Sequence, residues 1–177
     1  MLRSEFDLIL LKNLIMLYRK IFPSYDWDED VAYVNQIINY PKIVGVENAG
    51  FMKNVPNEEI KKSDEAIANW ITKNMNGCSC YVLFVGERTY LSRWIHYEME
   101  LACQLNLGIL VIFLDGMKDL YGRVCGLGID PFAYHGMYSA IPSPNLYLIR
   151  QYHWTAFSNP YELLPSWIED ACQRAGR

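Results

Sequence analysis

Residues 80–114, CYVLFVGERTYLSRWIHYEMELACQLNLGILVIFL, hold two continuous apolar runs, residues 80–85 and 108–114, on either side of an amphipathic segment of helix length. Runs of this kind are typical of strands that are covered on both faces. Strand, helix and strand joined by short links predict a right-handed parallel crossover. The stretch therefore predicts an open, mostly parallel α/β sheet with helices on both faces, and a ligand site at the carboxyl ends of its strands.

The flanking sequence continues this alternation. The acidic turn at residues 26–30 opens an apolar-periodic segment, and Gly77 is placed to end a later one in the left-handed conformation. Further strands are expected at residues 19–25, 42–46 and 146–149, and further helices near residues 31–38, 60–76 and 160–173. No internal repeat or linker interrupts the pattern, so residues 19–177 are expected to form a single domain.

Composition narrows the class of protein. The chain has 177 residues, 51% of them hydrophobic, which is ordinary globular usage. With 16 basic and 20 acidic residues, and a formal charge of -4, nucleic acid is not expected as a partner. The five cysteines form no CxxC pair, and the three histidines show no ligand spacing, so no metal site is predicted. A reducing cytoplasm fits this cysteine usage best.

Residues 1–18 are expected to be an amphipathic extension, with residues 4–17 forming a helix that docks on the domain. The apolar run at residues 8–17 is interrupted by Lys12 and is too short to span a bilayer, so no membrane span is expected. Two alternatives stay open for this segment: a start of translation at Met16, and a helix lying on a membrane surface.

Glu98 is the residue that departs from ordinary amphipathic patterning. At roughly 100° per residue it falls among Trp94, Leu101 and Leu105 on one face of the helix at about residues 92–105. Burial of an ionised carboxylate costs several kcal/mol, roughly, unless it is paired, hydrogen-bonded or protonated. One interpretation is a buried salt bridge to Arg88 or Arg93. The other is a catalytic carboxylate at the mouth of a cleft after a core strand.

Four further features of the sequence belong together: residues 85–98 (VGERTYLSRWIHYE), 21–26 (IFPSYD), 62–77 and 130–134 (DPFAY). These stretches resemble TIR-like domains, especially the ThsB proteins of bacterial Thoeris anti-phage defence. The most specific is the Thr-x-x-Ser-Arg-Trp-x-x-x-Glu spacing that ends at Glu98. The resemblance covers about residues 20–154 and implies a flavodoxin-like α/β fold.

The resemblance also implies an activity, cleavage of the nicotinamide–ribose bond of NAD, with the glutamate that matches Glu98 as the catalytic residue. A carboxylate there would support the oxocarbenium ion that forms as nicotinamide leaves. The substrate-binding residues expected around it are Phe22, Ser24, Tyr25, Thr89 and Trp94. NAD would be the substrate, and no separate cofactor is expected.

The resemblance implies a biological setting as well. Attack by water would make the protein a hydrolase that releases ADP-ribose, whereas attack from within the molecule would give a cyclic isomer. The ThsB likeness favours a cyclic ADP-ribose-type messenger, made in response to phage, that acts in nucleotide signalling on a separate effector protein. A homo-oligomer is compatible with this setting.

Two departures from the family pattern bear on the pocket. Pro23 is expected at the end of its strand because proline cannot donate to a strand ladder. The acidic residue that the family carries after its second strand has no clear match in residues 47–50.

Two rival functions remain. A TIR-like fold can serve as a non-enzymatic assembly module, because fold alone does not determine function. A magnesium-dependent phosphoacceptor is the second, suggested by Asp26, Asp28 and Asp30 after one strand and Asp115 after another. The simpler interpretation is that the first three acids start a helix and that Asp115 starts a turn.

Overall fold

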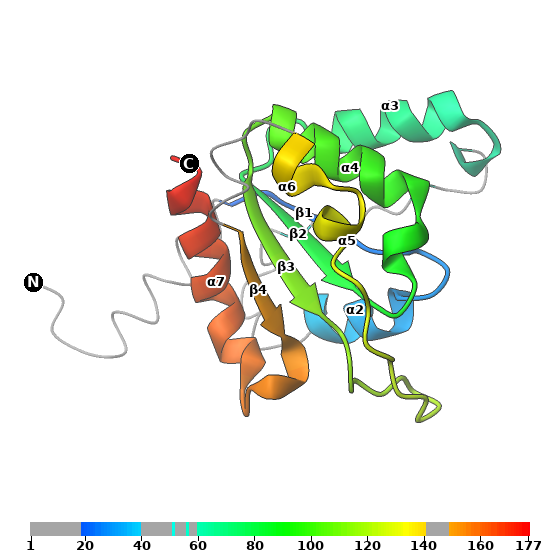
Figure 1. The fold of residues 1–177 in the computed structure, drawn as a ribbon, viewed down its shortest axis with the longest axis vertical. Helices are drawn as coiled ribbons and strands as arrows, with labels where there is room; N and C mark the ends of the chain where they lie inside the picture. Colours follow the sequence, from blue (N-terminus) through cyan, green and yellow to red (C-terminus); the bar gives the residue numbers. More distant parts are fainter. Residues whose placement is uncertain (1–18, 40–50, 52–55, 57–59, 141–148) are drawn as a thin grey trace, which may run out of the picture.

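The fold is a parallel sheet of four described strands between two layers of helices (Figure 1). The computed structural model describes residues 19–39, 51, 56, 60–140 and 149–177. The strands lie side by side in chain order and every neighbouring pair is parallel: β1 (Ile21–Ser24), β2 (Cys80–Val85), β3 (Gly108–Phe113) and β4 (Arg150–His153). This arrangement confirms the predicted α/β class.

The helices connect these strands and cover both faces of the sheet. The α-helices are α2 (Val31–Ile38), α3 (Asp64–Met75), α4 (Arg93–Gln104), α5 (Pro131–Tyr134), α6 (Met137–Ala140) and α7 (Pro160–Arg174). Short 3₁₀ turns in the described ranges are η1 (Ile60–Lys62), η2 (Thr89–Leu91) and η4 (Trp154–Ala156). None of the described helices combines the length and the apolar character needed to cross a membrane.

The buried strands divide their side chains between two hydrophobic cores. Cys80, Val82 and Phe84 of β2 pack with residues of α2 and α7. The alternate residues of the same strand, including Tyr81 and Leu83, pack with residues of α3 and α4. Because successive side chains of a strand point to opposite faces, a fully apolar strand supplies both cores at once.

Strand positions agree with the sequence prediction in the centre of the sheet and differ at its edges. The predicted runs at residues 80–85 and 108–114 match β2 and β3 to within one residue. Pro23, expected at the end of its strand, is instead the third of the four residues of β1 and lies opposite Val82. In the described part of the chain β1 is bordered on its other side only by a single bridge from Ile21 to Phe51, and proline is tolerated in such thinly paired strands.

The last strand begins later in the chain than the apolar residues 146–149 predict. The prediction of a strand at residues 146–149 is wrong at Ile149, which lies just before β4, and β4 itself is made of the polar residues Arg150–His153. A strand at the sheet edge is covered less than a central one, so its sequence need not be apolar. The strand predicted at residues 42–46 and the extension at residues 1–18 lie outside the described residues.

The contact between α7 and β3 is close enough to require glycine at residue 108. A β-carbon built on Gly108 would lie 2.7 Å from the backbone carbonyl of Ala171 and 2.8 Å from the backbone nitrogen of Cys172. Backbone atoms of a packed helix cannot move aside as a flexible side chain can. The helix therefore rests directly on the strand at this point.

We predict that Gly108→Ala lowers the free energy of unfolding by about 1–3 kcal/mol, because α7 must shift to admit the methyl group. Chemical denaturation measures this change. Gln104→Ala, on the exposed end of α4, is the control and should stay within about 0.5 kcal/mol of the wild type. Equal stability of Gly108→Ala and wild type would contradict the close approach.

Candidate active site

Glu98 lies on the buried face of α4. It is 2% exposed, and the neighbours on the same face, Ile95, Met99 and Ala102, are almost fully buried. Trp94, Leu101 and Leu105, the stripe predicted from the sequence, are only half-buried. The sequence therefore predicted only one side of the apolar face. The other side, formed by Ile95, Met99 and Ala102, is the more deeply buried of the two.

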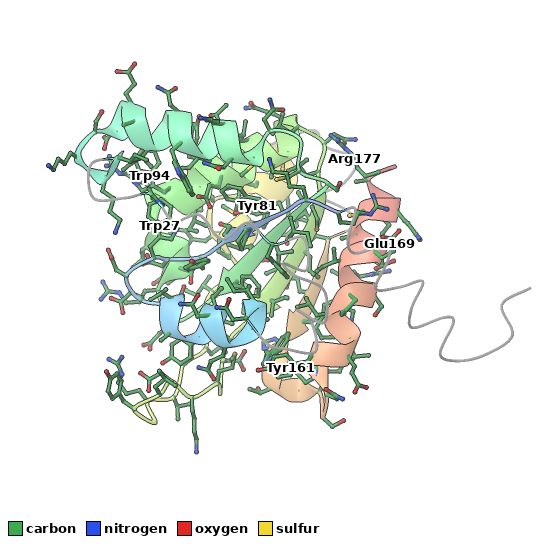
Figure 2. The ribbon with its side chains drawn as sticks, turned by 180° about the vertical axis from the view of Figure 1, so that it is seen from behind. Trp27, Tyr81, Trp94, Tyr161, Glu169 and Arg177 are labelled. Atoms are coloured by element: carbon green, nitrogen blue, oxygen red, sulfur yellow. The ribbon has the colours of Figure 1, made fainter. Side chains whose placement is uncertain are left out.

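Two hydroxyl groups from the sheet reach toward the Glu98 carboxyl. The Ser24 hydroxyl, at the end of β1, donates a hydrogen bond to Glu98 Oε2. The Tyr81 hydroxyl, on β2, donates to Ser24 Oγ at 2.8 Å. Figure 2 shows Tyr81 in the middle of the domain, on the sheet. The parallel strands β1 and β2 and the helix α4 thus bring three hydrogen-bonded polar groups, those of Ser24, Tyr81 and Glu98, together inside an apolar layer.

A small cavity of about 90 Å³ opens beside this carboxyl. One wall comes from the turn after β1 and the other from the start of α4; the lining residues are Tyr25, Asp26, Trp27, Asp28, Ser92, Trp94, Ile95 and Glu98. Trp27 and Trp94 lie toward the same edge of the domain (Figure 2). The cavity therefore combines aromatic walls with the buried Glu98 carboxyl and two further acids, Asp26 and Asp28, at the carboxyl end of a strand as expected for this class of sheet.

Burial governs the acidity of Glu98. Removal from water raises the pKa of its carboxyl to about 8, and the hydrogen bond from Ser24 offsets part of that rise. Neither arginine predicted as a salt-bridge partner pairs with it in the described part of the chain. Arg93 binds Asp64 at 2.8 Å on the surface, and Arg88 is exposed. The salt-bridge interpretation is therefore not what the structure shows.

The predicted site residues separate into two groups. Ser24 contacts Glu98, and Tyr25 and Trp94 line the cavity next to it. Phe22 and Thr89 are not among the lining residues. Phe22 is buried between Trp70 and Tyr81 in the core under α3 and α4. Its side chain lies on the same face of β1 as Ser24 but two residues earlier, farther from the carboxyl end of the strand.

Thr89 belongs to a second buried polar cluster that the sequence did not reveal. Its hydroxyl donates to Asp30 Oδ2 at 2.6 Å and accepts from the Gly86 amide at 2.7 Å. Burial raises the pKa of Asp30 to about 6, and the Thr89 hydrogen bond opposes the rise. This cluster ties the loop before α4 to the start of α2. Asp30 is the last acid of an acidic turn. In the sequence it differs from the other acids of that turn only in preceding the apolar Val31.

Two acids of the rival phosphoacceptor hypothesis have side-chain partners elsewhere in the domain. Asp30 bonds Thr89, whereas Asp115 Oδ1 lies 2.6 Å from His153 Nδ1. Among the residues that the structure describes, no three His, Cys, Asp or Glu side chains are grouped so as to hold a metal ion. The four carboxylates therefore do not form the shared site that the hypothesis needs.

The parallel sheet with a buried glutamate in the helix after its central strand defines this chain as a TIR-like α/β domain. The profile of the family described as "Thoeris protein ThsB, TIR-like domain" matches residues 22–119, more than half of the chain, and the match spans Glu98 and its cavity. The chain belongs to this ThsB family.

A relative in Bacillus cereus (strain MSX-D12) is named "Putative cyclic ADP-D-ribose synthase ThsB1". It is 26% identical over 144 residues, which cover 77% of this chain and 71% of the relative.

The buried carboxyl makes stability depend on pH in a predictable direction. The pKa of Glu98 rises on folding from its ordinary 4.5 to about 8, so the folded state holds the proton more tightly than the unfolded state. Its stabilising contribution is present below about pH 4.5 and is lost as the pH rises toward 8. The free energy of unfolding of wild type minus that of Glu98→Gln should therefore fall across this range, with a slope of up to about 1.4 kcal/mol per pH unit.

Denaturant titrations at several pH values give this difference. Subtracting the variant cancels the titration of Asp30, which both proteins share. Glu100→Gln is the matched control, since Glu100 sits on the wetter side of the same helix. A difference curve that stays flat for Glu98→Gln would mean that the carboxyl is not held as the structure shows.

Proposed function

We propose that this chain is an NAD-cleaving TIR-like enzyme that breaks the nicotinamide–ribose bond, with Glu98 as its catalytic carboxylate. The observation that carries the proposal is a buried carboxyl, without a cationic partner in the described chain, at the wall of a cavity lined by aromatic side chains. The name of the Bacillus cereus relative supports the same chemistry.

The geometry suits a reaction whose leaving group is already cationic. The C1′–N bond of the nicotinamide ribose breaks with its electron pair going to the ring nitrogen, so neutral nicotinamide leaves and positive charge develops on the ribose. A carboxylate in a water-poor site can accept hydrogen bonds from the ribose hydroxyls and gains strength as that charge grows. Tyr25 and Trp94 would flank the sugar and the ring, and Ser24 would hold the carboxylate.

The elevated pKa has a role in this scheme. Without ligand the carboxyl is largely protonated at neutral pH, because its pKa is about 8. A cationic nicotinamide ring placed beside it favours the ionised form. Binding of NAD would thus release a proton from Glu98 and create the carboxylate where the reaction needs it.

The cavity beside Glu98 limits how NAD can enter. Its volume of about 90 Å³ is well below the roughly 300–1,000 Å³ of pockets that hold a whole ligand of this class. The proposal therefore places only the nicotinamide ribose end against Glu98, with the rest of the dinucleotide outside. Phe22 would support the site indirectly, by packing against Trp70 in the core. Thr89 would support it by holding the loop before α4.

For the product we propose a cyclic ADP-ribose-type messenger. A nucleophile in the adenosine part of the same molecule would attack C1′ and lose its proton, giving a cyclic isomer, nicotinamide and H⁺ from one NAD. The chain belongs to the family described as a Thoeris protein, and we propose that it acts in anti-phage defence, as the resemblance to ThsB proteins implies. There the product would diffuse through the cytoplasm to a separate effector protein after a phage-derived trigger.

A second candidate function, a non-enzymatic assembly module, has one observation in its favour. Five large apolar side chains are exposed on the segment between β3 and α5: Leu120, Tyr121, Val124, Leu127 and Ile129. Such a segment can mark a protein contact. If assembly were the whole function, Glu98→Gln would protect cells from phage as well as wild type does.

We expect Glu98→Gln to lower NAD cleavage at least about 100-fold, because the neutral amide gives no charge to the developing oxocarbenium ion. Purified protein is incubated with NAD, with and without lysate from phage-infected cells, and the products are identified by mass spectrometry. Glu100→Gln should cleave NAD at nearly the wild-type rate. Unchanged turnover in Glu98→Gln would remove this residue from the mechanism.

The pH profile of the wild type tests the ionisation step separately. Because the free enzyme must lose the Glu98 proton, kcat/KM should rise about tenfold per pH unit at low pH and level off above about pH 8. The profile of kcat reports the complex with NAD and should level off at a lower pH, since bound nicotinamide favours the carboxylate. A kcat/KM profile that is already level at pH 6 would argue against a carboxyl of raised pKa.

A further inference from the structure

Tyr81 is a fully buried residue near the site, and its side chain has a single polar atom, the hydroxyl oxygen. It is fully buried on β2, between Phe22 of β1 and Ile109 of β3 in the register of the sheet. Its ring stacks on that of Phe22 with the centroids 6.3 Å apart. A buried tyrosine hydroxyl needs a hydrogen-bond partner, and here the partner is Ser24.

The hydroxyls of Tyr81 and Ser24 and the carboxyl of Glu98 form a chain of hydrogen bonds that all donate in the same direction. Ser24 has one hydroxyl proton, and it is donated to Glu98. The hydrogen bond between Ser24 and Tyr81 must then use the Tyr81 proton and a lone pair of Ser24. Donation runs from Tyr81 to Ser24 to Glu98, and each donor polarises the next toward the carboxylate.

We infer that Tyr81 is a positioning residue which, acting through Ser24, fixes the Glu98 carboxyl and favours its ionised form. Its catalytic consequence rests on the proposed NAD cleavage, whereas its effect on the titration of Glu98 does not. Tyr81 itself stays a neutral donor, because burial and the nearby Glu98 raise its pKa well above the ordinary value. It is fully buried and is not among the residues that line the cavity, so it would act on Glu98 through Ser24 and not by contact with the substrate.

Other titratable groups face Glu98 and must be kept constant in a test. Tyr25 follows β1 and lines the cavity, and the charge of Glu98 adds to the effect of burial in raising the pKa of this tyrosine. Asp26 and Asp28 line the cavity from the turn after β1. None of these groups hydrogen-bonds Tyr81 in the described structure, so removal of the Tyr81 hydroxyl leaves them in place.

The test is Tyr81→Phe, which removes the hydroxyl and keeps the ring. Loss of the donor should move the midpoint of the Glu98 titration upward by about half a pH unit. The kcat/KM for NAD would then fall about threefold at pH values below the midpoint and converge on wild type above it. A purely structural defect would lower the rate by the same factor at every pH. Tyr97→Phe is the matched control, because that hydroxyl contacts Thr72 on the outer side of α4.

Ser24→Ala shows whether the effect passes through the serine. It should shift the midpoint at least as far as Tyr81→Phe does, and adding Tyr81→Phe to it should produce no further shift. Additive shifts would overturn the proposed order of the chain. Ser24→Ala also keeps the inference testable if Tyr81→Phe does not fold, since an unmoved midpoint in Ser24→Ala contradicts the relay.

The titration of Glu98 is also read without NAD, from the difference in unfolding free energy between each protein and its Glu98→Gln counterpart. A midpoint that moves in this difference supports the relay even if the wild type cleaves no NAD, in which case only the proposed reaction fails. A wild type that cleaves NAD, together with an unmoved midpoint in Tyr81→Phe, overturns the inference and leaves the proposed reaction standing.

Discussion

The removal of one carboxyl group from water is the constraint on which the account of this protein depends. Glu98 lies on the buried face of α4 with the Ser24 hydroxyl, rather than a basic side chain, as its partner. Burial raises the pKa of its carboxyl to about 8, and the hydrogen bond from Ser24 only partly opposes that rise. An apolar side chain of similar size would pack there without the cost of desolvation. The position of the carboxyl is therefore better explained by chemistry at the adjoining cavity than by stability.

The rest of the domain holds this group in place. The parallel sheet brings Ser24 and Tyr81 to the same face from two neighbouring strands, and α4 lies across them. The Asp30–Thr89 cluster fixes the loop from which α4 begins, on the far side of the acidic turn. Packing at Gly108 secures the opposite layer. The site thus depends mainly on helices and strands, and the parts of its wall outside them are the segment at residues 25–28 and Ser92, the residue before α4.

Much of this could be predicted from the sequence, because the central strands are apolar on both faces and leave a clear pattern. The two core strands and α4 were predicted to within one or two residues, and Glu98 stood out by its periodicity. The polar strand β4 could not be found in the same way, since an edge strand carries no apolar signal. Asp30 and Tyr81 were missed for a related reason. One lies within an acidic run and the other within an apolar one, and only three-dimensional contacts separate them from their neighbours.

The protonation state of Glu98 can be measured directly by infrared or carbon NMR spectroscopy of protein labelled at glutamate, with Glu98→Gln used to assign the signal. We predict a carboxyl that titrates near pH 8 in the free protein and at a lower pH when a non-cleavable NAD analogue is bound. A Glu98 signal that titrates near 4.5 and does not respond to the analogue would mean that the carboxyl is neither held away from water nor in contact with the substrate.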